Sequence, residues 1–223
     1  RALATVEEMA AHYLQCIKEV QPEGPYSLGG WSLGGVVAFE MARQLESRGE
    51  TVELLALIDS FAPGNNGRPG RVPDGELVSL FANDLVRRLG NGHGASLPDL
   101  AQLTAGDALR RLADEAKRLG LLPPWLQDGM LERRFLVFQS NFRALERYLG
   151  GPCAAPLILF KAAELPASEA WPEPDLGWGR LAQRPVEVRE VVGNHYTLLE
   201  EHSVDILASH LRERLVAGAR AQA

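Results

Sequence analysis

The stretch VELLALID constrains the fold of this chain more than any other. It covers residues 52–59 and is almost continuously apolar after its second residue, which suits a parallel strand that is buried on both faces. A shorter strand is predicted at 26–30, and the spacing of apolar residues predicts a helix at 33–48. A strand, a helix and a strand in this order form one βαβ unit. The chain is therefore predicted to belong to the α/β class, with a mostly parallel sheet.

The middle of the sequence has helical patterns. Between about residues 64 and 150, three segments show the apolar spacing of helices, and no strand-like run interrupts them. A stretch of this length is too long for a plain loop. Strand-like sequence returns with PLILFKA and VEVREVV, and a final helix follows. We expect a single domain over residues 1–223, in which an all-helical lid at about 64–150 is inserted into a core made of 1–63 and 151–223.

Composition and charge argue against several classes of function. Hydrophobic residues make up 46% of the 223, which is enough for a substantial core, and the net charge of −6 disfavours a nucleic-acid-binding surface. No apolar run reaches the roughly 18 residues that a membrane-spanning helix needs, and the first residues do not resemble a signal peptide. The two cysteines, Cys16 and Cys153, have no zinc-ligand spacing. We expect a cytoplasmic protein that binds no metal, nucleic acid or membrane.

The sequence GWSLG at residues 30–34 lies at the junction between the first predicted strand and its helix. A G-x-S-x-G pattern in this context is typical of a nucleophile elbow, a sharp turn that presents the serine hydroxyl at the carboxyl edge of the sheet. The flanking glycines remove Cβ atoms that would collide where strand and helix pack closely. We predict that Ser32 is a nucleophile and that the backbone N–H of Leu33 is an oxyanion donor. The alternative, a glycine-rich loop with an incidental serine, is disfavoured by the strand–turn–helix context.

A serine hydroxyl becomes a good nucleophile only when a base takes its proton, and an acid orients that base. Asp59 ends the second predicted strand, so we expect its carboxylate at the same sheet edge as Ser32. Of the five histidines, His195 alone directly follows a predicted final strand, in the loop GNH, and it is the predicted base. The alternatives are that Asp59 caps the next segment and that His195 is a surface residue in a turn, with His202 as the reserve base.

Two long segments resemble a known family. They are VEEMAAHYLQCIKEVQPEGPYSLGGWSLGGVVAFEMARQLESRGETVELLALIDS and GNHYTLLEEHSVDILASHL, and the similarity covers about residues 5–60 and 155–215. They are similar to the thioesterase domains that end modular polyketide synthases and nonribosomal peptide synthetases, and to the thioesterases of animal fatty-acid synthases. GWSLGG is closer to an embedded terminal domain than to a free-standing editing thioesterase. The resemblance implies an α/β-hydrolase fold with a variable lid, and it places the nucleophile on Ser32, the acid on Asp59 and the base on His195.

The resemblance also implies a reaction and a partner. An acyl or peptidyl chain would arrive as a thioester on the 4′-phosphopantetheine arm of an acyl or peptidyl carrier protein in the same megasynthase, and the domain itself would need no cofactor. Ser32 would take the acyl group as an ester, which water would hydrolyse or an internal hydroxyl or amine would cyclise. The alternatives are a carboxylesterase or lipase that acts on oxygen esters, and a non-catalytic binding module with a hydrolase-like fold.

The family has about three further strands before the first helix of this chain, and one of those strands bears the second oxyanion donor. Residues 1–25 contain one predicted helix and a turn. We therefore expect these strands, together with the second donor, to be absent from this chain.

Aromatic residues near the elbow and in the helical insertion are candidates for a substrate channel. A long, mostly carbon acyl chain favours an apolar wall. We predict that Trp31, Phe135, Phe138 and Phe142 contribute to this wall. The alternative for each of the three phenylalanines is packing between the lid helices and the core.

Overall fold

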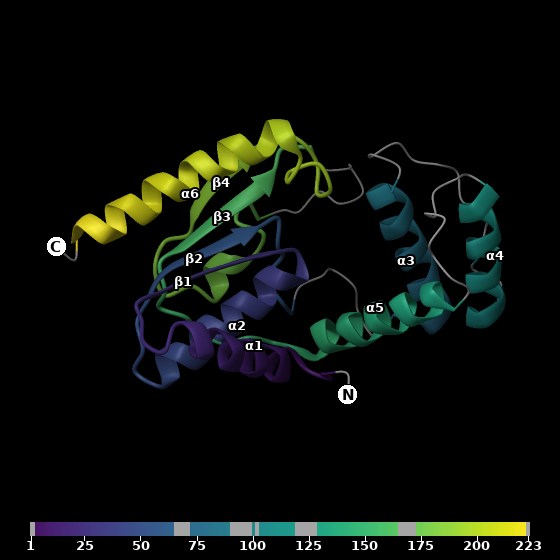
Figure 1. The fold of residues 1–223 in the computed structure, drawn as a ribbon, viewed down its shortest axis with the longest axis horizontal. Coiled ribbons are helices and arrows are strands. Elements are labelled where there is room, and N and C mark those ends of the chain that lie inside the picture. Colours follow the sequence, from purple (N-terminus) through teal and green to yellow (C-terminus); the bar gives the residue numbers. More distant parts are fainter. Residues whose placement is uncertain are drawn as a thin grey trace. The chain divides into compact units, whose positions relative to one another are not determined.

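A computed structural model describes residues 3–64, 72–89, 100, 103–118, 129–164 and 173–221 (Figure 1). The chain divides into two compact units. The core unit contains Leu3–Arg68 and Arg143–Ala223, and the helical unit contains Pro69–Phe142. The expected organisation, a single domain with an inserted lid, stays a prediction.

The core unit is built on a four-stranded sheet in the order β1-β2-β3-β4, and each neighbouring pair of strands is parallel. The strands are β1 (Tyr26–Trp31), β2 (Val52–Ile58), β3 (Leu157–Ala162) and β4 (Glu187–Val191). This arrangement confirms the predicted α/β class with a mostly parallel sheet. Because all four strands point the same way, their carboxyl ends form one edge of the sheet (Figure 1).

Helices cover both faces of this sheet (Figure 1). On one face, side chains such as Leu55 pack in a buried cluster with α1 (Val6–Val20) and α2 (Leu33–Ser47). On the other face, side chains such as Leu54 pack with α6 (Glu201–Ala221). Successive residues of a strand point to opposite faces, so a central strand between two helical layers needs apolar residues at almost every position. This requirement explains the sequence of β2.

The register between the strands determines which residues meet at the carboxyl edge. Trp31 pairs with Ile58, and Ile58 pairs with Phe160. The Ser32 N–H donates a hydrogen bond to the carbonyl of Ile58 at 3.0 Å, and the Asp59 N–H donates to the carbonyl of Phe160 at 2.7 Å. The residues that directly follow β1 and β2 are therefore neighbours at this edge.

The helical unit has an apolar core of its own. Its described helices are α3 (Asp74–Leu89), α4 (Ala105–Arg118) and α5 (Met130–Arg147), and the last of these continues into the core unit after Phe142. Leucine and phenylalanine side chains from all three helices form one buried cluster. The helical unit thus buries many of its apolar residues among its own helices, although Leu136 and Val137 of α5 are exposed.

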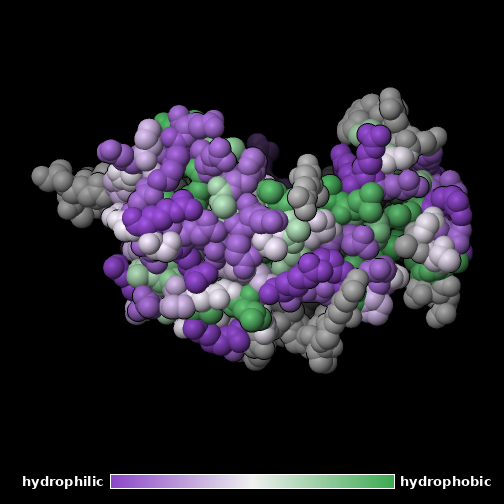
Figure 2. Space-filling model, turned by 90° about the horizontal axis from the view of Figure 1, so that it is seen from below, coloured by the Kyte–Doolittle hydropathy of each residue, from purple (hydrophilic) through white to green (hydrophobic). Residues whose placement is uncertain are grey.

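The surface is largely polar on the face drawn in Figure 2, where hydrophilic residues dominate and apolar residues gather in smaller areas. None of the helices in the described ranges combines the length and the hydropathy that a bilayer crossing requires.

Candidate active site

The turn between β1 and α2 has the geometry of a nucleophile elbow. Ser32 lies directly between the two elements and has φ 56° and ψ −127°. A positive φ is uncommon for a residue other than glycine, and residues with such strained backbones cluster at functional sites. Two backbone hydrogen bonds of 3.0 Å hold this conformation, one from Ser32 to Ile58 and one from Gly35 to Ser32. The Ser32 hydroxyl makes no capping hydrogen bond to the helix that it precedes.

Two glycines allow close packing at the elbow: Gly30 lets β1 and α2 approach each other, and Gly35 lets the start of α2 approach the segment that follows β2. A Cβ atom on Gly30 would overlap the carbonyl of Gly34, and a Cβ atom on Gly35 would lie 2.6 Å from the Cβ of Ser60. A Cβ atom on Gly34, in contrast, would meet nothing within 4 Å. The prediction that the flanking glycines avoid collisions is therefore confirmed for Gly30 and wrong for Gly34, which faces open space.

Separate replacement of Gly30 and Gly34 by alanine tests this difference. We expect Gly30→Ala to lower the free energy of unfolding by about 1–3 kcal/mol, because the added methyl group forces strand and helix apart. We expect Gly34→Ala to leave the free energy of unfolding unchanged or to raise it by up to about 1 kcal/mol, since alanine favours the helical conformation. Urea denaturation of both variants gives the two values. Equal destabilisation by both substitutions would contradict the packing described here.

Asp59 directly follows β2 and is 1% exposed. Its Oδ1 accepts a hydrogen bond from the backbone N–H of Ala162 at 2.9 Å, and its Oδ2 lies 2.7 Å from Nδ1 of His195. Like Ser32, it has a positive φ, of 42°. A buried carboxylate needs hydrogen-bond partners. The end of β3 and the histidine supply one partner to each oxygen, so the carboxylate is fixed in a single orientation.

The loop after β4 carries His195 in a turn that its own side chains stabilise. Oδ1 of Asn194 accepts hydrogen bonds from the backbone N–H groups of Tyr196 at 2.9 Å and Thr197 at 3.2 Å, a pattern that asparagine favours in turns. The Asn194 N–H donates to Oγ1 of Thr197 at 2.9 Å. Gly193 has φ 106°, and a Cβ atom there would lie 2.7 Å from Oγ1 of Thr197. The sequence GNH thus folds into a compact turn at the carboxyl edge of the sheet.

Aromatic side chains surround the His195 ring. The Trp31 indole stacks on it, with ring centroids 4.8 Å apart and an interplanar angle of 29°, and Nε1 of the indole donates to the backbone carbonyl of His195 at 3.1 Å. The Tyr196 ring meets the imidazole edge-on at 5.1 Å. The imidazole side chain remains 23% exposed. Because Nδ1 faces Asp59, Nε2 is the ring nitrogen that a serine base would use.

The structure brings two of the three predicted catalytic side chains, those of Asp59 and His195, into direct contact. Within the described ranges it records no hydrogen bond between the Ser32 hydroxyl and the His195 ring. Such bonds are often long in enzymes without substrate and tighten when the substrate binds. Ser32 lies beside Asp59 because of the register of β1 and β2. The assignment of the three residues as a catalytic triad stays a prediction.

Two further predicted roles concern helix starts. Leu33 is the first residue of α2, where backbone N–H groups have no acceptor within the helix. Its predicted role as an oxyanion donor stays a prediction. His202, the reserve base, lies in the first turn of α6, and its side chain is outside the part of the chain that the structure describes.

The sequence did not reveal that Trp178 holds the backbone next to the predicted acid, Asp59. This residue is fully buried, and its Nε1–H donates to the backbone carbonyl of Ser60, the residue after Asp59, at 2.7 Å. The indole packs on Phe39 of α2 with ring centroids 4.8 Å apart. The signal in the sequence is a tryptophan between two glycines, and the structure places it as the first residue of the short 3-10 helix η2 (Trp178–Arg180). Such a residue has no helical or strand periodicity, so only the folded structure shows its partner.

The predicted channel residues of the helical unit pack against one another. Phe135 is buried, and Phe138 and Phe142 are partly buried beside it. The ring of Phe81 lies 5.6 Å from that of Phe135 and 5.4 Å from that of Phe138, and Phe138 lies 6.0 Å from Phe142. These contacts form a small aromatic core. The proposed contribution of these residues to a channel wall stays a prediction.

The buried cysteine does not offer a competing nucleophile. Cys153 is 2% exposed, and burial raises the pKa of its thiol to about 11, so the sulfur is held as an unreactive thiol. No group of three or more His, Cys, Asp and Glu side chains in the described ranges is arranged to hold a metal ion.

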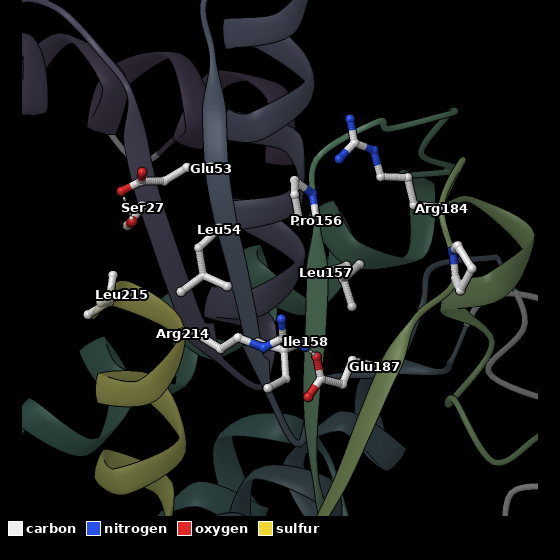
Figure 3. Close-up of a pocket in the computed structure, with 11 residues that line it drawn as sticks. Ser27, Glu53, Leu54, Pro156, Leu157, Ile158, Arg184, Glu187, Arg214 and Leu215 are labelled. Carbon is white, nitrogen blue, oxygen red and sulfur yellow. Dashed lines mark hydrogen bonds and ion pairs between the residues drawn. The ribbon is translucent and has the colours of Figure 1, made fainter. Parts of the chain in front are cut away.

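Figure 3 shows a pocket of about 480 Å³. It lies at the opposite end of the sheet from Ser32, Asp59 and His195. Its lining comes from the amino-terminal ends of the strands, including Ser27, Leu54 and Leu157, and from α6. Arg214 of α6 pairs with Glu187 of β4 in this region. None of Ser32, Asp59 and His195 lines the pocket. It is therefore not the place where an ester on Ser32 would form.

Comparison with known proteins gives consistent matches along the chain. The family model for a thioesterase domain matches residues 1–215. A non-reducing polyketide synthase of Pseudevernia furfuracea is 32% identical over 215 residues, which cover 91% of this chain and 10% of that protein. A non-reducing polyketide synthase of Aspergillus terreus is 32% identical over 216 residues, which cover 95% of this chain and 9% of that protein. The chain spans about a tenth of the length of these relatives.

Solved structures give the same match in three dimensions. Holo-AB3403, a four-domain nonribosomal peptide synthetase bound to AMP and glycine, superposes with a TM-score of 0.82 at 29% identity, over 95% of this chain and 16% of that chain. The NocB thioesterase domain, in a covalent complex with a fluorophosphonate nocardicin G analogue, superposes with a TM-score of 0.61 at 25% identity. That match covers 96% of this chain and 76% of the NocB chain.

Proposed function

Since this chain belongs to the thioesterase-domain family, with the α/β-hydrolase fold of its polyketide synthase and nonribosomal peptide synthetase relatives, we propose that it releases an acyl or peptidyl chain from a carrier protein through an ester on Ser32. The observation that carries the proposal is the 2.7 Å contact between His195 and the buried Asp59. This pair lies at the sheet edge where the strained elbow places Ser32. A serine, an imidazole and a buried acid at one sheet edge are the parts that acyl transfer requires.

In the first half of the reaction, Ser32 attacks the thioester carbonyl. Nε2 of His195 takes the hydroxyl proton as the C–O bond forms, while Asp59 accepts the Nδ1–H hydrogen bond and stabilises the imidazolium. The negative charge that develops on the carbonyl oxygen is stabilised by the backbone N–H of Leu33. When the C–S bond breaks, the imidazolium returns its proton to the departing thiolate. The products of this step are a free thiol and an ester on Ser32.

In the second half, a new nucleophile cleaves the ester. His195 takes a proton from water, or from a hydroxyl or amine of the bound chain, as that atom attacks the carbonyl carbon. The proton then passes to Oγ of Ser32 when the ester C–O bond breaks. Water gives a free acid, whereas an internal nucleophile gives a ring. The two outcomes use the same three side chains and differ only in which nucleophile reaches the ester.

The proposed substrate is a thioester on the 4′-phosphopantetheine arm of a carrier protein in the same synthase. Two findings support this choice: the two polyketide synthases compared above are each about ten times the length of this chain, and one structural neighbour is a four-domain peptide synthetase. Substrate delivery by a neighbouring domain also gives the thioester a high effective concentration at the site. The chain's own residues then need to bind only the acyl part and the end of the arm.

A comparison of two substrates in the intact protein tests the proposal. We expect an octanoyl thioester of N-acetylcysteamine, which mimics the end of the pantetheine arm, to be turned over with a higher kcat/KM than ethyl octanoate, because a thiol is the better leaving group. Faster turnover of the oxygen ester would favour a carboxylesterase. A fluorophosphonate probe provides the control, since a protein whose Ser32 stays unlabelled would be a binding module and not an enzyme.

A further inference from the structure

We propose that Trp31 is a positioning residue that sets the separation of Ser32 and His195, a role that rests on the serine mechanism proposed above. The indole makes two independent contacts with the base. Its hydrogen bond to the carbonyl holds the backbone of His195, and its stacked ring limits rotation of the imidazole. Asp59 holds the same ring from a different direction through Nδ1. These three contacts together determine the position of Nε2 before any substrate binds.

Trp31 suits this role because it is bonded directly to the nucleophile. It is the last residue of β1, and Ser32 follows it in the chain. In the sheet it pairs with Ile58, the residue that directly precedes Asp59. The hydrogen bond from the indole joins Trp31 to His195, which lies 164 positions later in the sequence. A small movement at the end of β1 therefore moves Ser32 and the indole of Trp31 together. Because the indole is hydrogen-bonded to His195, the distance between Ser32 and His195 is preserved.

The stacked indole also acts on the charge that develops during the reaction. When His195 takes the serine proton, the imidazole becomes a cation, and the negative face of an aromatic ring attracts a cation. The attraction is therefore stronger in the transition state, when the imidazole gains a positive charge, than before the proton is transferred. An interaction of this kind raises kcat and leaves substrate binding unchanged.

The sequence predicts a different role for Trp31, as a wall of the substrate channel, and the two roles have different kinetic consequences. Loss of a wall contact weakens binding of the acyl chain, so it raises KM and changes the preference for chain length. Loss of a positioning contact leaves KM unchanged and lowers kcat. It also slows the reaction of Ser32 with a fluorophosphonate, because that reaction needs the base but no acyl channel.

Two variants of Trp31 in the intact protein separate its contacts. Trp31→Phe keeps a stacked ring and removes the N–H donor, and we expect kcat to fall about fivefold, the usual effect of one hydrogen bond. Trp31→Leu removes both contacts, and we expect kcat to fall about 100-fold, as for a base displaced by about 1 Å. KM for the octanoyl thioester of N-acetylcysteamine stays unchanged in both. The rate of fluorophosphonate labelling falls in parallel with kcat.

Tyr26→Phe is a matched control at the other end of the same strand. It removes a ring-borne donor that bonds the backbone carbonyl of Pro22 at 3.0 Å, and we expect kcat and the labelling rate to stay at wild-type values. An unchanged kcat in both Trp31 variants, or a rise in KM alone, would overturn the positioning role. Should Trp31→Leu fail to fold, the kcat of Trp31→Phe decides the question. Full turnover by Ser32→Ala would instead refute the serine mechanism, whatever the Trp31 variants do.

Discussion

Ser32→Ala is expected to lower kcat for thioester cleavage by a factor on the order of 10⁶, which leaves only the residual catalysis that binding provides. The substitution removes the oxygen atom that attacks the thioester carbonyl. Without this oxygen, the ester intermediate on residue 32 cannot form. The fold should remain intact, because the hydroxyl makes no capping hydrogen bond to α2. Steady-state turnover of the octanoyl thioester measures the loss, and circular dichroism confirms the fold.

Ser32→Gly separates the chemical role of this residue from its backbone strain. The glycine variant is equally inactive, but it adopts φ 56° without the penalty that a side chain brings. We therefore expect its free energy of unfolding to exceed that of Ser32→Ala by about 1–3 kcal/mol in urea denaturation. Equal stabilities would show that the elbow is not strained. Turnover by either variant at a rate near that of the wild type would remove Ser32 from the mechanism.

Loss of the base or of its acid gives the second large effect. His195→Ala should lower kcat by on the order of 10⁴-fold or more, because no other group takes the serine proton. Asp59→Asn should cost on the order of 10⁴-fold, although the two side chains have almost the same shape. With its oxygen bonded to the N–H of Ala162, the asparagine would turn its NH₂ group toward Nδ1 of His195. That geometry selects the His195 tautomer in which Nε2 carries the hydrogen, so Nε2 cannot take the proton of Ser32.

The loss of activity in a double variant tests whether Asp59 acts only through His195. Combining Asp59→Asn with His195→Ala should cost no more than His195→Ala alone, since the acid acts only through the base. Additive losses would mean that Asp59 has a separate contact with the substrate. Thermal unfolding of each variant is the control, because Asp59 is buried and its replacement could also destabilise the end of β3.

The sheet and the elbow could be predicted from sequence because each has a local signal. The run VELLALI is apolar on both faces because β2 lies between two helical layers, and GWSLG combines a tight turn with a close strand–helix approach at Gly30. Both features depend on residues near one another in the chain. The candidate acid and base could be named for a related reason: each directly follows a strand, and parallel strands end at one edge.

The supports of the site could not be predicted, because they depend on contacts between distant residues. Nothing near Trp31 in the sequence indicates that its indole reaches His195, and nothing near Trp178 indicates the carbonyl of Ser60. Gly34 shows the converse error, since its place in the motif suggested a steric role that the packing does not require. Local patterns specify the turn types and strands, whereas partners across the fold follow from packing that no single segment encodes.

The central position of β2 has a consequence for how this protein is made on the ribosome. In the finished sheet β2 lies between β1 and β3, yet 103 residues separate Asp59 at its end from Ala162 at the end of β3. At a synthesis rate of about 5–20 residues per second, roughly 5–20 seconds pass before β3 emerges. During that interval the apolar VELLALI is an edge with unpaired backbone groups, the kind of edge that pairs with the wrong chain. One side of β2 therefore lacks its partner strand while the helical segments that follow β2 are being translated.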